Sequence, residues 1–221
     1  MIFVNFKTYP QGTGEEALKL AKICEEVSLK SNVEIIPVVQ FVDLFRISQE
    51  VKIPVWVQHL DFFPQGQHTG WENLEAVIEA GGKGTLLNHA EHQIPPGTVK
   101  QVIKRIQNSE FRIQKFMTMV CCHTLGQAER LAKLKPDYLA YEPPELISNK
   151  EKSVATEKPQ VIKKIVGLLG NLPLIIGAGI HCPKDIEISL SFGAKGILVS
   201  SDIVLAKDQK SALEDLVSGY K

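Results

Sequence analysis

The sequence predicts one domain, residues 1–221, folded as a (β/α)8 barrel of eight parallel strands. Short runs rich in valine, isoleucine and phenylalanine alternate with longer amphipathic stretches, which is typical of repeated βα units. A length of 221 residues lies within the range of about 200 to 250 in which such a barrel forms one domain. An open sheet that binds dinucleotides would carry a glycine-rich fingerprint after its first strand, where this chain has Phe6-Lys7-Thr8-Tyr9.

The expected strands are the apolar runs, and most are apolar at consecutive positions, as strands buried on both faces should be. They are Ile2–Phe6, Glu34–Val39, Pro54–Gln58, Gly84–Asn88, Lys115–Val120, Tyr138–Tyr141, Leu174–Ile176 and Gly196–Val199. The stretches between them place apolar residues at helical spacing, with charged residues on the remaining positions. The expected helices are Glu15–Leu29, Val42–Glu50, Asn73–Ala80, Gly97–Gln107, Leu125–Leu134, Pro159–Leu169, Pro183–Phe192 and Ser211–Ser218.

The charge balance and the first residues limit the classes of partner. Lysine and arginine (25) equal aspartate and glutamate (25), so the chain lacks the positive field that general nucleic-acid or membrane-surface binding requires. Residues 1–9 resemble neither a signal peptide nor a membrane span. We therefore expect a cytoplasmic protein that binds neither nucleic acid nor membrane.

The four cysteines do not indicate a disulfide framework or a metal site. Cys121 and Cys122 are adjacent on an expected strand, so their side chains should point to opposite faces and make a poor disulfide. His89 and His92 are three residues apart, but no further ligands stand at a spacing suitable for zinc. We therefore expect reduced thiols and no metal.

Three chemically active side chains stand at expected strand ends, where barrels of this type carry their chemistry. Lys7 follows the first strand, His89 the fourth and Glu142 the sixth, and Asn5 should point to the same side as Lys7. Each residue alone has a structural interpretation as a rim charge, a core histidine or a strand end. Together they suit proton transfer beside a carbonyl, with a carboxylate as base and the two others stabilising charge on oxygen.

Two segments near the end of the chain suit an anion. Gly177-Ala178-Gly179-Ile180 follows the seventh strand, and glycine allows backbone N–H groups to approach a phosphate closely. Val199-Ser200-Ser201 ends the eighth strand before a probable helix start. The loops after strands seven and eight are a frequent phosphate site in barrels.

These segments, in this order, resemble the triosephosphate isomerase family, especially its shorter branch. The resemblance runs nearly end to end, and its ordered set of motifs is specific. The matching segments are Asn5-Phe6-Lys7-Thr8-Tyr9, Gln58-His59-Leu60-Asp61, Gly66-Gln67-His68-Thr69-Gly70, Gly84-Thr85-Leu86-Leu87-Asn88-His89-Ala90-Glu91, Tyr141-Glu142-Pro143-Pro144-Glu145-Leu146-Ile147, Gly177-Ala178-Gly179-Ile180 and Gly196-Ile197-Leu198-Val199-Ser200-Ser201.

The resemblance implies a TIM barrel that interconverts dihydroxyacetone phosphate and glyceraldehyde 3-phosphate in glycolysis and gluconeogenesis, without a cofactor. It implies that Glu142 is the base, that neutral His89 polarises the carbonyl and that Lys7 with Asn5 anchors the substrate, which are the roles known for this family. Glu91 would lie behind the residues that contact the substrate, and a lid after the sixth strand would shield the enediol. The phosphate would be held at Ile147, Gly179, Ser200 and Ser201.

Three positions depart from the family pattern. Ala90-Glu91-His92-Gln93 stands where Ser-Glu-Arg-Arg is usual, which removes a hydroxyl and a basic pair, and Ser148–Ser153 replaces a glycine-rich lid tip. Asp202 stands where a glycine is usual. A carboxylate facing a bound phosphate at about 4 Å would cost roughly 1 to 4 kcal/mol. The competing interpretation makes Asp202 the N-cap of the last helix, turned away from the ligand.

Two further functions and an assembly stay open at this stage. The altered residues permit an isomerase or epimerase for another phosphorylated sugar, or a weakened homologue that only binds phosphorylated ligands. A homodimer or homotetramer is implied by residues 66–71, which match the protruding loop of family dimers. Exposed Phe62, Phe63 and Trp71 would fit a buried interface or simply cover the barrel rim.

Overall fold

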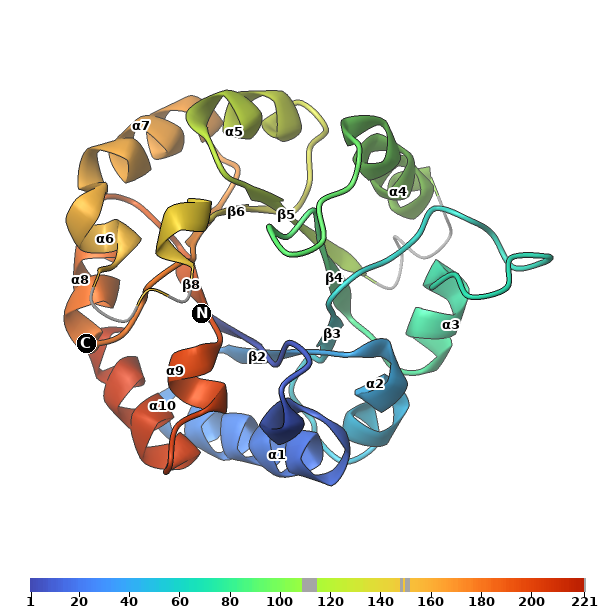
Figure 1. Ribbon diagram of the computed structural model, residues 1–221, viewed down its shortest axis with the longest axis horizontal. Coiled ribbons are helices and arrows are strands. Elements are labelled where there is room, and N and C mark those ends of the chain that lie inside the picture. The colour runs from blue at the N-terminus through green and yellow to red at the C-terminus, as the bar shows by residue number, and fades with distance from the viewer. Residues whose placement is uncertain (109–114, 148, 150–151, 221) are drawn as a thin grey trace.

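A computed structural model of the chain describes residues 1–108, 115–147, 149 and 152–220. Its parallel strands hydrogen-bond in chain order and close into a barrel, with β1 paired to both β2 and β8. Figure 1 shows the helices arranged as a ring around these strands. The predicted (β/α)8 fold class is confirmed. Within the described residues, no helix combines the length and the apolar character needed to cross a bilayer.

The strands are β1 Ile2–Asn5, β2 Ile35–Val39, β3 Trp56–Val57, β4 Gly84–Leu87, β5 Met117–Cys122, β6 Tyr138–Tyr141, β7 Leu174–Ile176 and β8 Gly196–Val199. The helices are α1 Gly14–Ser31, α2 Phe41–Ser48, α3 Leu74–Glu79, α4 Pro96–Asn108, α5 Leu125–Ala132, α6 Val154–Glu157, α7 Pro159–Leu169, α8 Pro183–Ser191, α9 Ser201–Val204 and α10 Gln209–Val217. Short 3-10 turns add Pro10–Gly12, Pro144–Leu146 and Ser218–Tyr220.

Backbone conformation explains where the observed strands differ from the predicted ones. Lys115 was expected to begin the fifth strand, but its φ of 53° is left-handed, so β5 begins at Met117 and extends to Cys122. Asn88, with φ of 60°, likewise ends β4 one residue early. The third strand is reduced to Trp56–Val57, and Pro54 lies before it because proline cannot donate to the sheet. The short helix α6 was not predicted, whereas α9 begins where a helix start was expected after the eighth strand.

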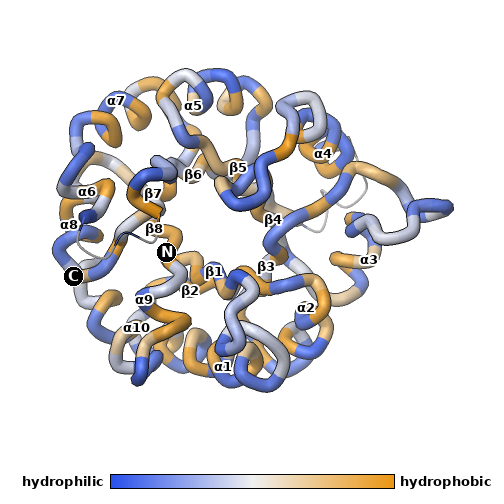
Figure 2. The backbone as a smooth tube through the Cα atoms, viewed as in Figure 1, coloured by the Kyte–Doolittle hydropathy of each residue, from blue (hydrophilic) through white to orange (hydrophobic). Residues whose placement is uncertain are grey.

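Two apolar layers hold the barrel together. One fills the barrel interior and includes Phe3, Trp56 and Cys121, whereas the other lies between strands and helices and includes Cys122. The neighbouring cysteines therefore do point to opposite faces of β5, as predicted. Figure 2 shows hydrophobic residues on the strands and along the strand-facing sides of many of the helices.

An aromatic layer packs the barrel near the strand starts. The ring of Phe3 meets those of Trp56 and Tyr138 edge-on, with centroids 5.0 and 5.7 Å away. Gly84 makes room for this layer, because a Cβ there would lie 2.3 Å from the Trp56 ring. The open end of the barrel is consequently the opposite one, at the strand ends.

Candidate active site

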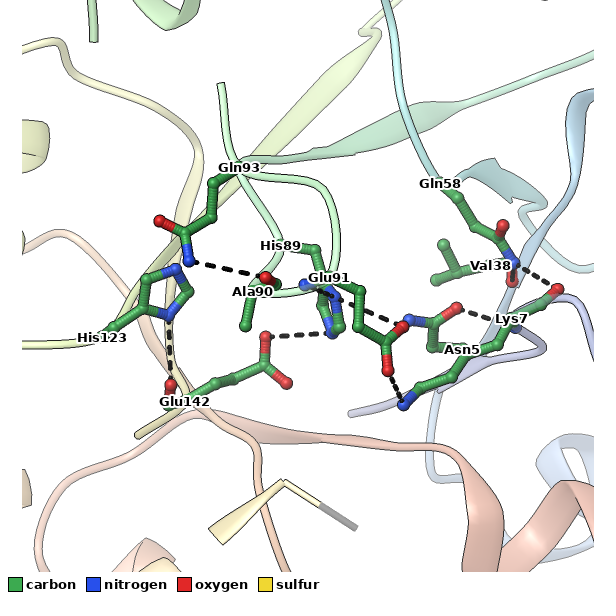
Figure 3. Close-up of polar contacts among 10 residues, drawn as sticks. All are labelled: Asn5, Lys7, Val38, Gln58, His89, Ala90, Glu91, Gln93, His123 and Glu142. Carbon is green, nitrogen blue, oxygen red and sulfur yellow. Dashed lines mark hydrogen bonds and ion pairs between the residues drawn. The ribbon is translucent and has the colours of Figure 1, made fainter. Parts of the chain in front are cut away.

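The strand ends bring Lys7, His89 and Glu142 to one cavity of about 420 Å³. Lys7 lies two residues beyond β1, His89 two residues beyond β4, and Glu142 directly beyond β6. Figure 3 shows the Glu142 carboxylate directed at the His89 ring, with Lys7 and Glu91 close to each other. The cavity is also lined by the other expected ligand-binding residues, namely Asn5, Ile147, Gly179, Ser200 and Ser201.

Glu142 is a buried carboxylate whose position depends on a glycine. Its side chain lies against Gly177, where an added Cβ would come within 2.6 Å of Oε1. Oε2 faces Nε2 of His89 at 3.5 Å and accepts no other hydrogen bond within the described ranges. Burial alone would raise the pKa of Glu142, but the interaction with the His89 ring, helped by the Cys121 thiol and His123, outweighs burial and lowers it. The group is thus an ionised base with one oxygen available.

The backbone determines the tautomer of His89. The amide N–H of Glu91 donates to Nδ1 of His89 at 3.2 Å, so Nδ1 carries no proton and the hydrogen resides on Nε2. The pKa of His89 is raised, because the Glu142 carboxylate outweighs the lowering effect of burial. The amide contact favours the neutral ring, because an imidazolium would direct a second N–H at that amide. Neutral His89 therefore donates from Nε2 toward the cavity.

Lys7 is fixed through both its backbone and its ammonium group. Its φ of 48° is left-handed, and the turn is held because its N–H donates to Asn5 Oδ1 at 3.0 Å. Gln58 Nε2 donates to the Lys7 carbonyl at 3.0 Å. Nζ lies 2.6 Å from Glu91 Oε1. Glu91 thus contacts Lys7 through its side chain and His89 through its amide, which gives it two contacts within the site.

The turn after His89 is stable despite its unusual residues. The His92 amide donates to the His89 carbonyl at 2.9 Å, and Gln93 Nε2 donates to the Ala90 carbonyl at 3.4 Å. His92 also stacks on His59, with ring centroids 4.4 Å apart. The replacement of the usual basic pair therefore leaves the backbone that orients His89 intact.

The far end of the cavity presents backbone and hydroxyl groups. Ala178 and Gly179 both have positive φ, 72° and 69°. An added Cβ on Gly179 would lie 2.1 Å from the Lys152 carbonyl oxygen, so this position requires glycine. The Ser200 hydroxyl is buried and has no hydrogen-bond partner among the residues that the structure describes. This donor is available to a ligand.

The interpretation of Asp202 as the N-cap of the last helix is wrong. Ser200 precedes α9 and Asp202 lies inside its first turn, while the N-cap of α10 is Asp208, whose carboxylate accepts from the Ser211 amide at 3.0 Å. Asp202 instead lines the cavity and accepts from His181 Nδ1 at 2.8 Å. A local capping signal cannot predict this contact, because its partner lies 21 residues away.

The segment expected to form a lid after β6 lies only partly within the described residues. Ser148, Lys150 and Glu151 lie outside the described residues. Asn149 lines the cavity and accepts from the Lys152 amide at 2.9 Å. Ser153 then begins α6, accepting from the Thr156 amide at 3.1 Å and donating to Asp185 at 2.5 Å. A serine directly before the apolar start of a helix is a capping signal that the sequence carried.

Sequence reasoning missed two residues that position Glu142. Gly177 was interpreted as part of a phosphate loop alone, although its lack of a side chain also makes room for the carboxylate. His123 holds the Glu142 backbone, with Nδ1 3.1 Å from the carbonyl oxygen of Glu142. Its place after the fifth strand was the available signal.

The aromatic residues beyond β3 are less exposed than expected. Trp71 is half exposed, but Phe62 and Phe63 are mostly covered, because their rings stack 4.2 Å apart and Trp71 lies 4.6 Å from Phe63. The expected exposure therefore holds for Trp71 and is wrong for the two phenylalanines.

Fold and site together define a (β/α)8-barrel enzyme with an acid–base site at its strand ends. The family model of triosephosphate isomerase matches residues 1–218. The triosephosphate isomerases of Methanothermus fervidus and Methanobacterium bryantii are each 39% identical over 99% of this chain, covering 97% and 96% of their own lengths. That of Methanocaldococcus jannaschii is 36% identical over 98% of both chains. The chain belongs to the triosephosphate isomerase family.

Proposed function

We propose that this protein interconverts dihydroxyacetone phosphate and glyceraldehyde 3-phosphate, an aldose–ketose isomerisation of glycolysis and gluconeogenesis. The observation that carries the proposal is the shared cavity of Glu142, His89 and Lys7, in which a buried carboxylate oxygen faces Nε2 of a neutral imidazole at 3.5 Å. Relatives named triosephosphate isomerase match this chain over nearly their full length and support the same reaction.

In the proposed mechanism Glu142 removes a proton from the hydroxyl-bearing carbon next to the carbonyl and returns it to the neighbouring carbon. His89 donates Nε2–H to the carbonyl oxygen as the enediolate forms, and takes a proton from the other oxygen. The Lys7 ammonium stabilises the negative charge on oxygen, while Glu91 and Asn5 hold Lys7 in place. The mechanism uses side chains alone and needs neither cofactor nor metal.

The phosphate of the substrate is proposed to lie at Ile147, Gly179, Ser200 and Ser201. These residues line the same cavity as Glu142, and the free Ser200 hydroxyl gives one donor. Asn149, which also lines the cavity, would help to shield the substrate from water during the reaction.

A coupled assay with each triose phosphate tests this proposal. Glu142→Gln keeps the shape of the side chain but removes the base, so kcat should fall by a factor on the order of 10² or more. Glu145→Gln is the matched control, because Glu145 is exposed and pairs with Lys158 outside the cavity. Wild-type protein no more active than Glu142→Gln would refute the assignment, and a preference for a longer sugar phosphate would transfer it to another isomerisation.

The protein is further proposed to be a cytoplasmic homodimer or homotetramer. A second cavity, lined by Gln58, His59, Glu72 and His92, adjoins Lys7 and His89 from the other side. In dimers of this family, the loop that matches residues 66–71 of one subunit enters beside the active site of the other. The half-exposed Trp71 suits such a contact. Size-exclusion chromatography with light scattering tests the assembly: a monomer at micromolar concentration would contradict it.

A further inference from the structure

A side-chain pair that the proposed mechanism does not use joins the loops after β7 and β8. His181 lies after β7, and its Nδ1 is 2.8 Å from Oδ1 of Asp202 in the first turn of α9. The second carboxylate oxygen of Asp202 accepts from the Ser201 hydroxyl at 3.4 Å. Both oxygens of Asp202 are thus engaged by neighbouring side chains.

Burial of the other ring nitrogen indicates the charge of this pair. Nε2 of His181 is buried and has no hydrogen-bond partner in the described part of the chain. A proton on Nε2 would be left there without an acceptor, which is unfavourable. The proton of a neutral ring therefore resides on Nδ1 and is donated to Asp202. The pair as a whole keeps the single negative charge of the carboxylate.

That charge stands at the end of the cavity proposed to hold a phosphate. Asp202 lines the cavity together with Gly179, Ser200 and Ser201. The ammonium group of Lys7, which lines the same cavity, is already paired with Glu91. Repulsion between a carboxylate and a phosphate falls with distance. The direction in which Asp202 points therefore affects how tightly the anion binds.

We propose that His181 is a positioning residue that holds the Asp202 carboxylate turned away from a bound phosphate, and that the pair thereby sets the affinity for phosphorylated substrates. The inference rests on the proposed function, because it requires that this cavity binds a phosphate group. The backbone of His181 is held in turn by a neighbouring carboxylate. The His181 amide donates to the buried Asp185 carboxylate at 2.9 Å, and the Cys182 thiol and the Ser153 hydroxyl also contact that carboxylate.

A double-mutant cycle with inorganic phosphate as the probe tests the pair. His181→Ala frees the carboxylate to turn toward the anion, so phosphate should bind about tenfold more weakly, and KM should rise more than kcat falls. In an Asp202→Asn background the same substitution should change phosphate binding less than twofold. His181→Asn places an amide nitrogen near the position of Nδ1 and should restore most of the affinity.

Controls and contrary outcomes are defined by the geometry. Asp208→Asn removes a carboxylate from the start of the next helix, outside the cavity, and should leave phosphate binding unchanged. An equal effect of His181→Ala in both backgrounds, or a loss of kcat without weaker phosphate binding, would overturn the inference. If His181→Ala does not fold, His181→Gln replaces it, because its amide reaches toward Nε2 and leaves Asp202 without the donor.

The probe also separates this inference from the proposed function. Phosphate binding is measured by calorimetry without turnover. If His181 and Asp202 are coupled in phosphate binding but the protein is inactive on triose phosphates, the isomerase assignment is rejected and the inference about the pair still holds. Wild-type protein that binds no phosphate would reject the inference about the pair.

Discussion

Replacing Gly177 by alanine is expected to lower kcat about a hundredfold while the protein stays folded. The new methyl group would lie 2.6 Å from Oε1 and 2.7 Å from Cγ of Glu142. Ordinary contact begins at 3.4 Å, so the carboxylate must recede by about 0.8 Å. A misplacement of about 1 Å at a reacting group can cost on the order of 10² in rate.

The backbone at Gly177 does not have positive φ, so alanine adds no conformational strain there. The stability cost should be that of overpacking, typically about 1 to 3 kcal/mol. Steady-state kinetics with both triose phosphates, together with urea unfolding, measure the two effects separately.

Gly167→Ala is the matched control for this substitution. A Cβ at Gly167, within α7, would meet nothing within 4 Å. The control should keep wild-type kinetics and gain up to about 1 kcal/mol in stability, because alanine favours the helix. Gly177→Ala with wild-type kcat would show that the contact with Glu142 does not fix the base, and the reasoning would be refuted.

The charge of Glu142, the hydrogen bond of Tyr220 and the buried side chain of Leu20 each give one further test. Loss of the Glu142 charge should reduce kcat/KM as the pH falls through its lowered pKa. His89→Gln should shift this acidic limb of the residual activity to higher pH, because burial is then opposed only by the Cys121 thiol and His123. An unshifted limb would contradict the coupling. Tyr220→Phe removes a 2.5 Å hydrogen bond to the Met1 carbonyl. The free energy of unfolding in urea should fall by about 1 kcal/mol. An unchanged midpoint would show that water replaces the lost hydrogen bond. Leu20→Ala empties a fully buried site in α1 and should cost about 2 to 5 kcal/mol, with kcat unaltered; a loss of kcat would show that the outer layer reaches the site.

The sequence was sufficient for the barrel and for the residues at its strand ends. Burial on both faces makes parallel strands continuously apolar, and a residue just past such a strand must lie at the mouth of the barrel, which placed Lys7 and His89. The assignment of residues 1–221 to one domain stays a prediction.

What the sequence could not predict depends on contacts between distant segments. Asp202 has the residue type and position of an N-cap, and its actual partner His181 becomes its neighbour only when β7 and β8 lie side by side. Lys115 has an ordinary strand neighbourhood in the sequence, and the residue types around it do not reveal its left-handed φ. The room that Gly177 leaves is visible only once Glu142 is placed against it.

The edge-on packing of Phe3, Trp56 and Tyr138 makes the barrel a chamber with a closed floor. Substrate therefore enters and product leaves through the same opening at the strand ends, so a product molecule must depart before the next substrate can bind. Turnover is therefore governed by the segments around the strand ends. Substitutions in the aromatic layer should change the stability of the barrel without changing the rate of turnover.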